Sequence, residues 1–338
     1  MSPKTVNDIG EDGVIRLIHG RGITSLPPRV RKGIGEDCAV LETDGDSLLL
    51  VTTDTLIEGI HFTAETLPPQ ALGWKALAVN VSDIAAVGGT PHTAFLSMGI
   101  KPETEVSFVE SFMEGFEAMA AETDIVLAGG DTVESPYGAV ITITLLGGSL
   151  PEHLVYRSGA KIGDDIWVTG PLGNAAAGLF VLLKKDPSER AGYESLITAL
   201  QRPMPRLEIG KALGQSGLAH SMIDVSDGVA KDLRHICEES GTGALLEAAS
   251  LPLSDQLEKL ASLAKRDPME WALRGGEDYE LLFTASSANK DKIVSLTTKV
   301  LGNPAVKVGT IDQEDGIRLE TNKGKQPLRP GGFTHFSG

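Results

Sequence analysis

The most informative stretch of the chain reads Val51-Thr-Thr-Asp-Thr-Leu-Ile-Glu-Gly-Ile-His-Phe62. The apolar run Leu48 to Val51 predicts a buried strand that leads into this acidic, hydroxyl-rich segment. We therefore expect the carboxylate of Asp54 at a strand end, beside the hydroxyls of Thr52 and Thr53. Carboxylate, hydroxyl and main-chain carbonyl oxygens together suit a hard cation such as Mg2+.

Four other predicted turns share this pattern of Asp beside Gly, Ser or Thr. They are Gly33-Ile-Gly-Glu-Asp37, Asn80-Val-Ser-Asp83, Gly129-Gly-Asp-Thr132 and Ile223-Asp-Val-Ser-Asp-Gly228. In such turns backbone N–H groups can face phosphate while carboxylates hold a metal against it. A single Asp beside Gly is most often a turn former or a helix N-cap. Five such turns in one chain favour a metal and phosphate site.

Length and composition predict a two-domain globular protein. A chain of 338 residues exceeds one typical core, and the segment Gly147 to Pro151 divides it into residues 1–149 and 150–338. No stretch of eighteen uncharged apolar residues and no cationic leader is present, so we expect no membrane span and a cytoplasmic location. Cys38 and Cys237 fit reduced thiols there.

The formal charge of -16 argues against a nucleic-acid partner, because counterion release needs clustered Lys and Arg. A polyphosphate ligand would need divalent cations to screen it, and the acidic turns could bind several. A merely solvated acidic surface fits the charge equally well. No Walker sequence occurs, and Cys38 stands where a dinucleotide fingerprint needs its third glycine.

Periodicity predicts an α/β (α+β) architecture in both halves. The first half reads β-β-α-β-α-β-β, a mixed sheet with helices on one face: strands at 39–41, 48–51, 92–100, 125–128 and 139–146, and helices at 68–87 and 103–122. The second is an αβ domain: strands at 166–169, 220–225 and 281–284, helices at 174–184, 194–201, 206–215 and 229–240, and a weaker αβ tail. Asp83 falls on an apolar helix face, which favours a ligand role.

Six motifs, in order along nearly the whole chain, resemble those of the thiamine-monophosphate kinases. They are Gly33-Ile-Gly-Glu-Asp-Cys-Ala-Val-Leu41, Thr53-Asp-Thr-Leu-Ile-Glu-Gly-Ile-His-Phe62, Lys75-Ala-Leu-Ala-Val-Asn-Val-Ser-Asp83, Gly129-Gly-Asp-Thr132, Asp224-Val-Ser-Asp-Gly228 and Gly275-Gly-Glu-Asp-Tyr-Glu-Leu281. The wider superfamily includes aminoimidazole ribonucleotide synthetase and selenophosphate synthetase. The second and sixth motifs resemble the kinase branch.

The resemblance implies ATP-dependent phosphorylation of thiamine monophosphate to thiamine diphosphate, with several Mg2+ ions. It also implies a homodimer built on the N-terminal domains, with ATP near the interface. The implied metal ligands are Asp37, Thr52, Thr53, Asp54, Asp83, Asp131, Asp224 and Asp227, and the catalytic carboxylates among them are Asp54, Asp131 and Asp227. Gly130, Asp131, Arg157 and Ser226 would bind ATP, and His61, Glu277 and Phe333 would bind thiamine phosphate.

Several of these residues also have ordinary structural interpretations. His61 could be a core histidine, Phe333 a packed tail residue, Glu277 an exposed turn residue and Arg157 a surface arginine. Two other functions stay open: another ATP-using synthetase of the same superfamily, and a non-catalytic dimer that binds nucleotide or metal. The lack of an obvious general base is no objection to the kinase, since a phosphate monoester has a second pKa of about 6.

Overall fold

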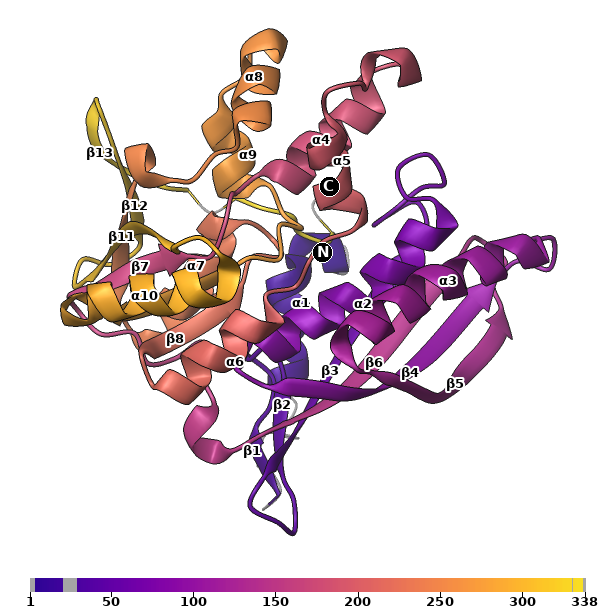
Figure 1. The fold of residues 1–338 in the computed structure, drawn as a ribbon, viewed down its shortest axis with the longest axis horizontal. Coiled ribbons are helices and arrows are strands. Elements are labelled where there is room, and N and C mark those ends of the chain that lie inside the picture. The colour runs from indigo at the N-terminus through magenta and orange to yellow at the C-terminus, as the bar shows by residue number, and fades with distance from the viewer. Residues whose placement is uncertain (1–3, 21–28, 330, 337–338) are drawn as a thin grey trace.

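The N-terminal half forms a six-stranded sheet in the order β1-β2-β3-β6-β4-β5 (Figure 1). The computed structural model describes residues 4–20, 29–329 and 331–336. The elements of this half are η1 (Val6–Asp8), α1 (Gly10–His19), β1 (Val30–Lys32), β2 (Ala39–Glu42), β3 (Leu48–Ile57), α2 (Pro69–Ala86), β4 (Thr90–Ile100), α3 (Val106–Thr123), β5 (Val126–Glu134) and β6 (Val140–Ser149). β4 pairs with β5 in parallel and with β6 antiparallel, which confirms a mixed sheet.

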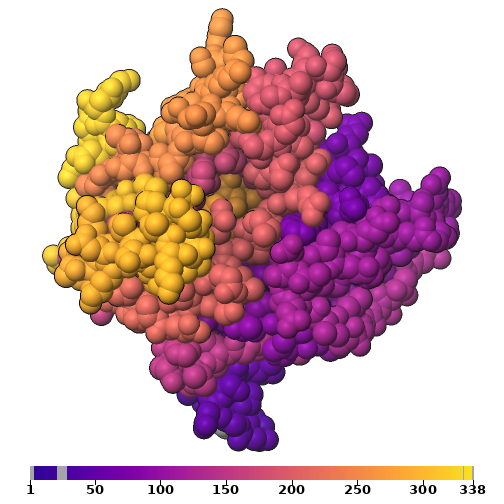
Figure 2. Space-filling model, viewed as in Figure 1, coloured from indigo at the N-terminus to yellow at the C-terminus, as the bar shows by residue number. Residues whose placement is uncertain are grey.

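The C-terminal half forms a seven-stranded sheet in the order β13-β12-β9-β11-β7-β10-β8. Its elements are η2 (Pro151–His153), β7 (Asp164–Val168), α4 (Asn174–Lys184), η3 (Pro187–Glu189), α5 (Glu194–Gln201), α6 (Leu207–Ser216), β8 (Ala219–Asp224), α7 (Val229–Ser240), β9 (Gly243–Glu247), η4 (Ala248–Ser250), α8 (Asp255–Ala264), α9 (Pro268–Arg274), β10 (Leu281–Ser286), η5 (Ser287–Asn289), α10 (Lys290–Leu301), β11 (Val306–Asp312), β12 (Ile317–Thr321) and β13 (Gly324–Pro327). In Figure 2 the two halves lie against each other.

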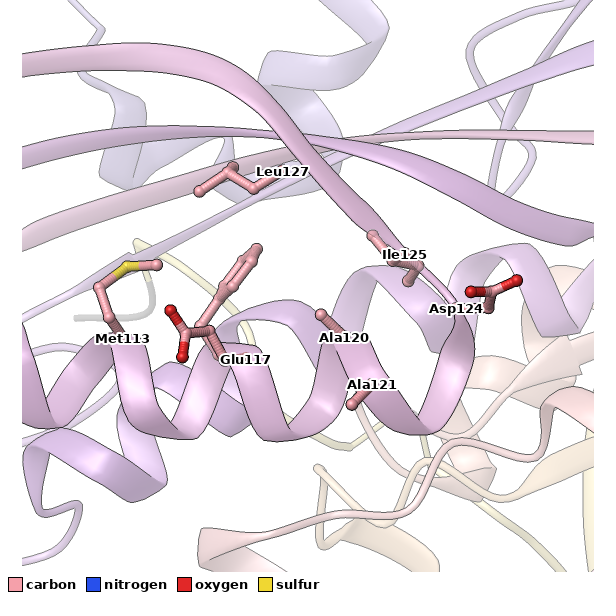
Figure 3. A pocket seen from close by; sticks show the side chains of 8 residues that line it. Met113, Glu117, Ala120, Ala121, Asp124, Ile125 and Leu127 are labelled. Carbon is pink, nitrogen blue, oxygen red and sulfur yellow. The ribbon is translucent and has the colours of Figure 1, made fainter.

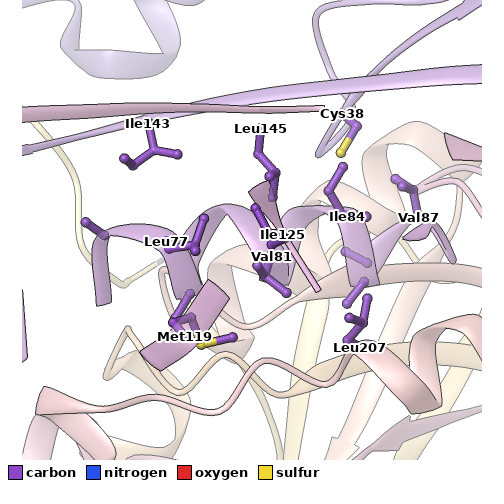
Figure 4. Close-up of a cluster of buried hydrophobic side chains, with 14 of the residues drawn as sticks. Cys38, Leu77, Val81, Ile84, Val87, Met119, Ile125, Ile143, Leu145 and Leu207 are labelled. Carbon is purple, nitrogen blue, oxygen red and sulfur yellow. The ribbon is translucent and has the colours of Figure 1, made fainter. Parts of the chain in front are cut away.

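Helix α2 is enclosed by both halves of the molecule. Fifteen of its eighteen residues are buried, as expected for a helix whose sequence is apolar on all sides. It packs on β3, β4 and β6 of the first sheet and on α6 and β8 of the second half. Figure 4 shows it between Ile143 and Leu145 on one side and Met119 and Leu207 on the other. Polar side chains on α2 are therefore enclosed as well.

Two glycines bring the backbones of α2 and α3 into contact. A Cβ atom on Gly73 would lie 1.8 Å from the carbonyl oxygen of Phe112, and one on Gly115 would lie 1.7 Å from that of Gln70. No side chain fits at either position without moving one helix away from the other. This contact keeps both helices on the same face of the sheet, as Figure 1 shows.

The predicted limits agree best for three helices of the second half. α4, α5 and α7 begin and end at the predicted residues. Three turn predictions were wrong. Asn80-Val-Ser-Asp83 lies inside α2, where the periodicity predicted a helix. β3 continues to Ile57, so Asp54 lies inside a strand, and β5 runs through Gly129-Gly-Asp-Thr132 instead of ending there. The reason is pairing, because β3 follows β6 along its whole length and β5 follows β4. Ladder hydrogen bonds override the local turn preference of Asp and Gly.

The two sheets share a buried core. The largest apolar cluster joins Leu50 and Leu77 of the first half to Leu207 and Phe283 of the second. β6 ends at Ser149, and the division of the chain after residue 149 stays a prediction. Within the described ranges, no helix is both long and apolar enough to cross a lipid bilayer. The cytoplasmic location likewise stays a prediction.

We expect Gly115→Ala to destabilise the fold by about 1–3 kcal/mol, because the added methyl group meets the backbone of α2. Thermal denaturation followed by circular dichroism should show a Tm lower by several degrees. Gly45→Ala is the matched control, since the atom nearest to a Cβ there is the Thr43 Oγ1 at 3.8 Å. Equal Tm values for Gly115→Ala and wild type would contradict the close contact.

Candidate active site

A cavity of about 520 Å³ lies between α2 and β3 of the first half and the β8–α7 segment, the 276–279 turn and the C-terminal tail. Its two ends differ in chemistry. The acidic end is lined by Asp54, Asp83, Asp224, Ser226 and Asp227, and the aromatic end by Ile60, His61, Glu277, Phe333 and His335. One continuous space therefore joins a carboxylate-rich surface to a surface suited to an organic ring.

Three aspartates converge at the acidic end. Asp37 precedes β2, Asp83 lies on α2 and Asp224 ends β8, yet one carboxylate oxygen from each lies within 4.8 Å of the others. The Oδ2 atom of Asp37 is buried and has no hydrogen-bond partner in the described part of the chain. A buried, unpaired anionic oxygen is costly unless a cation contacts it. These oxygen donors fit Mg2+.

Neighbouring side chains orient each of these carboxylates. The Thr52 hydroxyl donates to Asp83 Oδ2, and the Ser82 hydroxyl donates to Asp224 Oδ2 at 2.6 Å. The Arg157 guanidinium donates to Asp37 Oδ1 at 2.5 Å. Such outer partners fix the direction of metal-binding oxygens. Thr52 and Arg157 thus contact the acidic cluster, and their roles as a metal ligand and an ATP ligand stay predictions.

Burial and mutual repulsion raise the pKa values of the clustered carboxyls. Loss of solvation, with Asp37 and Asp227 nearby, raises the pKa of Asp54 to about 6. Loss of solvation, with Asp37 again nearby, raises the pKa of Asp224 to about 8. Burial, together with Asp54 and Asp224, raises the pKa of Asp83 well above its ordinary value. A divalent cation would reverse these shifts, because it favours the ionised form.

His61 presents a defined hydrogen-bond donor at the aromatic end. Its Nδ1 accepts from the Ile57 N–H at 3.0 Å, so the neutral ring carries its proton on Nε2. Burial lowers the pKa of His61, which favours this neutral form. The Nε2 lies 3.4 Å from His335 Nε2, and the ring centroid lies 6.1 Å from that of Phe333. Phe333 in turn meets His335 edge-on at 4.9 Å.

The 276–279 turn is strained and anchored. Glu277 and Tyr279 have φ values of 70° and 50°, a left-handed conformation that costs about 1–3 kcal/mol for each non-glycine residue. Between them, the Asp278 carboxylate accepts from the N–H groups of Gly173 at 2.5 Å and Ala175 at 3.2 Å. The glycine turn before α4, a possible phosphate site by sequence, therefore binds this carboxylate.

Comparison with known proteins places this site in a family. The model of the AIR synthase related protein N-terminal domain matches residues 35–148, and that of the C-terminal domain matches residues 161–322. The thiamine-monophosphate kinase of Buchnera aphidicola is 37% identical over 90% of this chain and 92% of its own, and that of Aquifex aeolicus is 34% identical over 98% and 99%.

The chain belongs to the thiamine-monophosphate kinases. Solved structures agree with this membership. AaThiL complexed with AMPPCP and TMP superposes with a TM-score of 0.88 at 32% identity, covering 99% of this chain and 100% of that one. The enzyme from Stenotrophomonas maltophilia K279a gives 0.76 at 38% identity over 91% and 94%. Escherichia coli HypE, a hydrogenase maturation protein, gives 0.70 at 19% identity, which shows a shared fold alone.

Not all residues implied by the family motifs meet in this cavity. The Thr53 hydroxyl bonds to the Ile143 carbonyl at 3.1 Å and to Thr144 at 3.2 Å, on the opposite face of β3 from Asp54. Gly130 and Asp131 lie on β5. In the sheet register, Asp54 pairs with Ile143, which pairs with Leu96, which pairs with Gly130. Three strand spacings, about 14 Å, therefore separate Gly130 from Asp54.

The structure also adds residues that the motifs did not reveal. Lys231 Nζ lies 2.6 Å from Asp227 Oδ2 and 3.3 Å from Glu11 Oε2, and it donates to the Phe333 carbonyl at 3.0 Å. It thereby joins α1, α7 and the tail beside the cavity. Lys231 follows Asp227 by four residues at the start of a predicted helix, and this spacing could have indicated the first of these pairs. Glu11 and His335 gave no sequence signal, since both approach from distant segments.

We expect the metal-free protein to lose thermal stability as the pH rises from about 4 to about 8. The pKa of Asp224 rises from 3.8 to about 8 in the fold, so the folded state binds more protons than the unfolded state in this range. Thermal scans at pH 5 and pH 8 with EDTA should show a lower Tm at pH 8.

Mg2+ should raise the Tm by several degrees more at pH 8 than at pH 5, because ligand carboxylates must be ionised. Asp224→Asn is the matched variant and should show a smaller pH dependence than wild type. A Mg2+ effect of equal size at both pH values would contradict a carboxylate cation site.

Proposed function

We propose that the protein transfers the γ-phosphoryl group of ATP to thiamine monophosphate, giving thiamine diphosphate and ADP. The observation that carries this proposal is the single cavity that joins the aspartate cluster to the aromatic end. An oxygen of the acceptor phosphate attacks the γ-phosphorus, and the bond from that phosphorus to the β–γ bridging oxygen breaks. The charge on the leaving diphosphate and on the acceptor must be screened in one place.

The acidic end of the cavity is proposed to hold the phosphates. Asp37, Asp54, Asp83, Asp224 and Asp227 would hold Mg2+, with Thr52 orienting Asp83. Bound Mg2+ supplies charge neutralisation and alignment of donor and acceptor oxygens. Arg157 adds a planar guanidinium and Ser226 a hydroxyl toward ATP. The acceptor phosphate, with its second pKa of about 6, arrives largely as a dianion and needs no strong base.

The aromatic end is proposed to hold the thiamine moiety. His61 offers the Nε2 proton as a hydrogen-bond donor, since its Nδ1 accepts from the backbone. The ring of Phe333, 44% exposed, offers a face to the cationic thiazolium. Glu277 offers a carboxylate acceptor on the same side of the cavity. These three residues together favour a cationic heteroaromatic phosphate as the acceptor.

The test of the proposed function is incubation of purified protein with Mg-ATP and thiamine monophosphate. Products are oxidised to fluorescent thiochromes and separated by chromatography. Thiamine diphosphate should form only with Mg2+ and the monophosphate, and not from free thiamine. ATP consumption without this product would favour another synthetase of the superfamily. If ATP is neither bound nor consumed, the non-catalytic alternative replaces the kinase.

Asp54→Asn should lower kcat at least about 100-fold, because it removes a carboxylate charge from the proposed phosphate-binding end. The control is Asp46→Asn, at an exposed position of the turn before β3. Both variants should keep the wild-type circular dichroism spectrum. Wild-type turnover by folded Asp54→Asn would remove Asp54 from the mechanism.

We further propose a homodimer built on the first sheet. All nine residues of the edge strand β5 are exposed, including Val126 at 65% and Val133 at 53%. A long exposed apolar edge is a template for pairing with another chain. Figure 3 shows a hollow beside this edge, where Met113 and Ala120 of α3 face Leu127. The position of Asp131 on β5, far from its own Asp54, suits ATP binding near such an interface.

The wild-type protein should sediment at twice the chain mass of 35.6 kDa in analytical ultracentrifugation. Val126→Lys combined with Val133→Lys should shift it to the monomer, because two buried lysines oppose pairing. Ile162→Lys changes a residue of similar exposure, 62%, in the second half and is the control. A monomeric wild type, or a double variant that stays dimeric, would contradict the interface.

A further inference from the structure

A lysine is almost fully buried in the apolar helix α2. The side chain of Lys75 is 2% exposed, and its Nζ lies 2.6 Å from Glu277 Oε1. Its helix neighbours Trp74, Ala76 and Leu77 are all buried. Burying an ammonium group is costly unless an anion compensates it. Among residues 4–20, 29–329 and 331–336, Glu277 is the one ion-pair partner of Lys75.

Glu277 is also fixed through its own backbone. Its φ value is 70°, and its N–H donates to the Ser226 carbonyl at 2.7 Å. The next residue, Asp278, is tied to the start of α4 through Gly173 and Ala175. The carboxylate of Glu277 therefore cannot follow a moving partner. It meets Lys75 on one side and, with 29% of its side chain exposed, faces the cavity on the other.

The ion pair with Lys75 places the Glu277 carboxylate where it can accept a hydrogen bond from a ligand. An ionised carboxylate only accepts hydrogen bonds, whereas a protonated carboxyl also donates. The Lys75–Glu277 pair has no net charge, so it attracts a cation only weakly. The carboxylate of Glu277 can still accept a hydrogen bond from a ligand. This suits an N–H donor on a heteroaromatic ring.

We propose that Lys75 is a positioning residue for acceptor recognition: it holds the Glu277 carboxylate in place, aimed at the amino group of the acceptor's aminopyrimidine ring. This inference rests on the proposed function. Lys75 does not line the cavity, so it acts through Glu277 and not by touching the substrate. A lysine that only stabilised the fold would leave substrate affinity and selectivity unchanged once the protein is folded.

The experiment compares Lys75→Met, Lys75→Arg, Glu277→Gln and the double variant Lys75→Met with Glu277→Gln. Steady-state rates are measured with thiamine monophosphate and with oxythiamine monophosphate, in which a hydroxyl group replaces the ring amino group. Lys307→Met is the control, because it removes a lysine that pairs with buried Asp165 at 2.7 Å outside the cavity. Circular dichroism verifies that each variant is folded.

Lys75→Met should raise KM for thiamine monophosphate about 10- to 100-fold, as for loss of a charged hydrogen bond, with kcat within about threefold and KM for Mg-ATP unchanged. Its preference for thiamine monophosphate over the oxy analogue should fall to that of Glu277→Gln. Lys75→Arg should restore most of the wild-type KM and most of the wild-type preference for thiamine monophosphate. The double variant should be no worse than Glu277→Gln alone, because the ion pair with Glu277 is the contact through which Lys75 is proposed to act on the substrate.

An unchanged KM in folded Lys75→Met, or losses that multiply in the double variant, would overturn this assignment while leaving the kinase intact. If Lys75→Met does not fold, the double variant is used instead, because it leaves no unpaired buried charge. Its KM and its preference between the two acceptors are then compared with those of Glu277→Gln. If wild-type protein does not phosphorylate thiamine monophosphate at all, the proposed function fails, and the role of Lys75 fails with it.

Discussion

Helix α2 has almost no surface exposed to solvent, and this enclosure constrains both halves of the molecule. The first sheet covers one side of it, α3 touches its backbone at Gly73 and Gly115, and the second half covers the rest. A helix in this position cannot rotate or slide without breaking contacts on every side. The polar side chains that it carries are therefore held in fixed places between the two sheets.

Those polar side chains are expensive to bury, and three of them have partners at the site, whereas Asn80 donates to the Ala76 carbonyl within α2. Asp83 accepts from Thr52, Ser82 donates to Asp224, and Lys75 pairs with Glu277. Each pair joins α2 to another element, so the contacts that close the core also shape the cavity. The left-handed turn at Glu277 persists because Asp278 and the backbone around Val225 and Ser226 hold it from both sides.

Local sequence predicts the elements that local chemistry controls. The limits of α4 and α7 follow from Gly173 and Gly241, which adopt left-handed conformations at their ends. Asp54 and Asp131 were expected in turns, and pairing with distant strands placed them inside β3 and β5. The convergence of Asp37, Asp83 and Asp224 was anticipated from recurring motifs. The approach of Glu11 and His335 was not, because contacts between distant segments leave no periodic pattern.

Because Lys75 and Asp83 lie on one helix, α2 fixes the distance between them. Eight residues at 1.5 Å each separate them by about 12 Å along the axis, within one side of the helix. Under the proposed function, Lys75 lies beside the ring-binding end and Asp83 at the phosphate-binding end, so a single helix sets the distance between the two ends. A ring without its phosphate reaches one end only. The fixed spacing of the proposed site therefore favours an acceptor that carries both a ring and a phosphate.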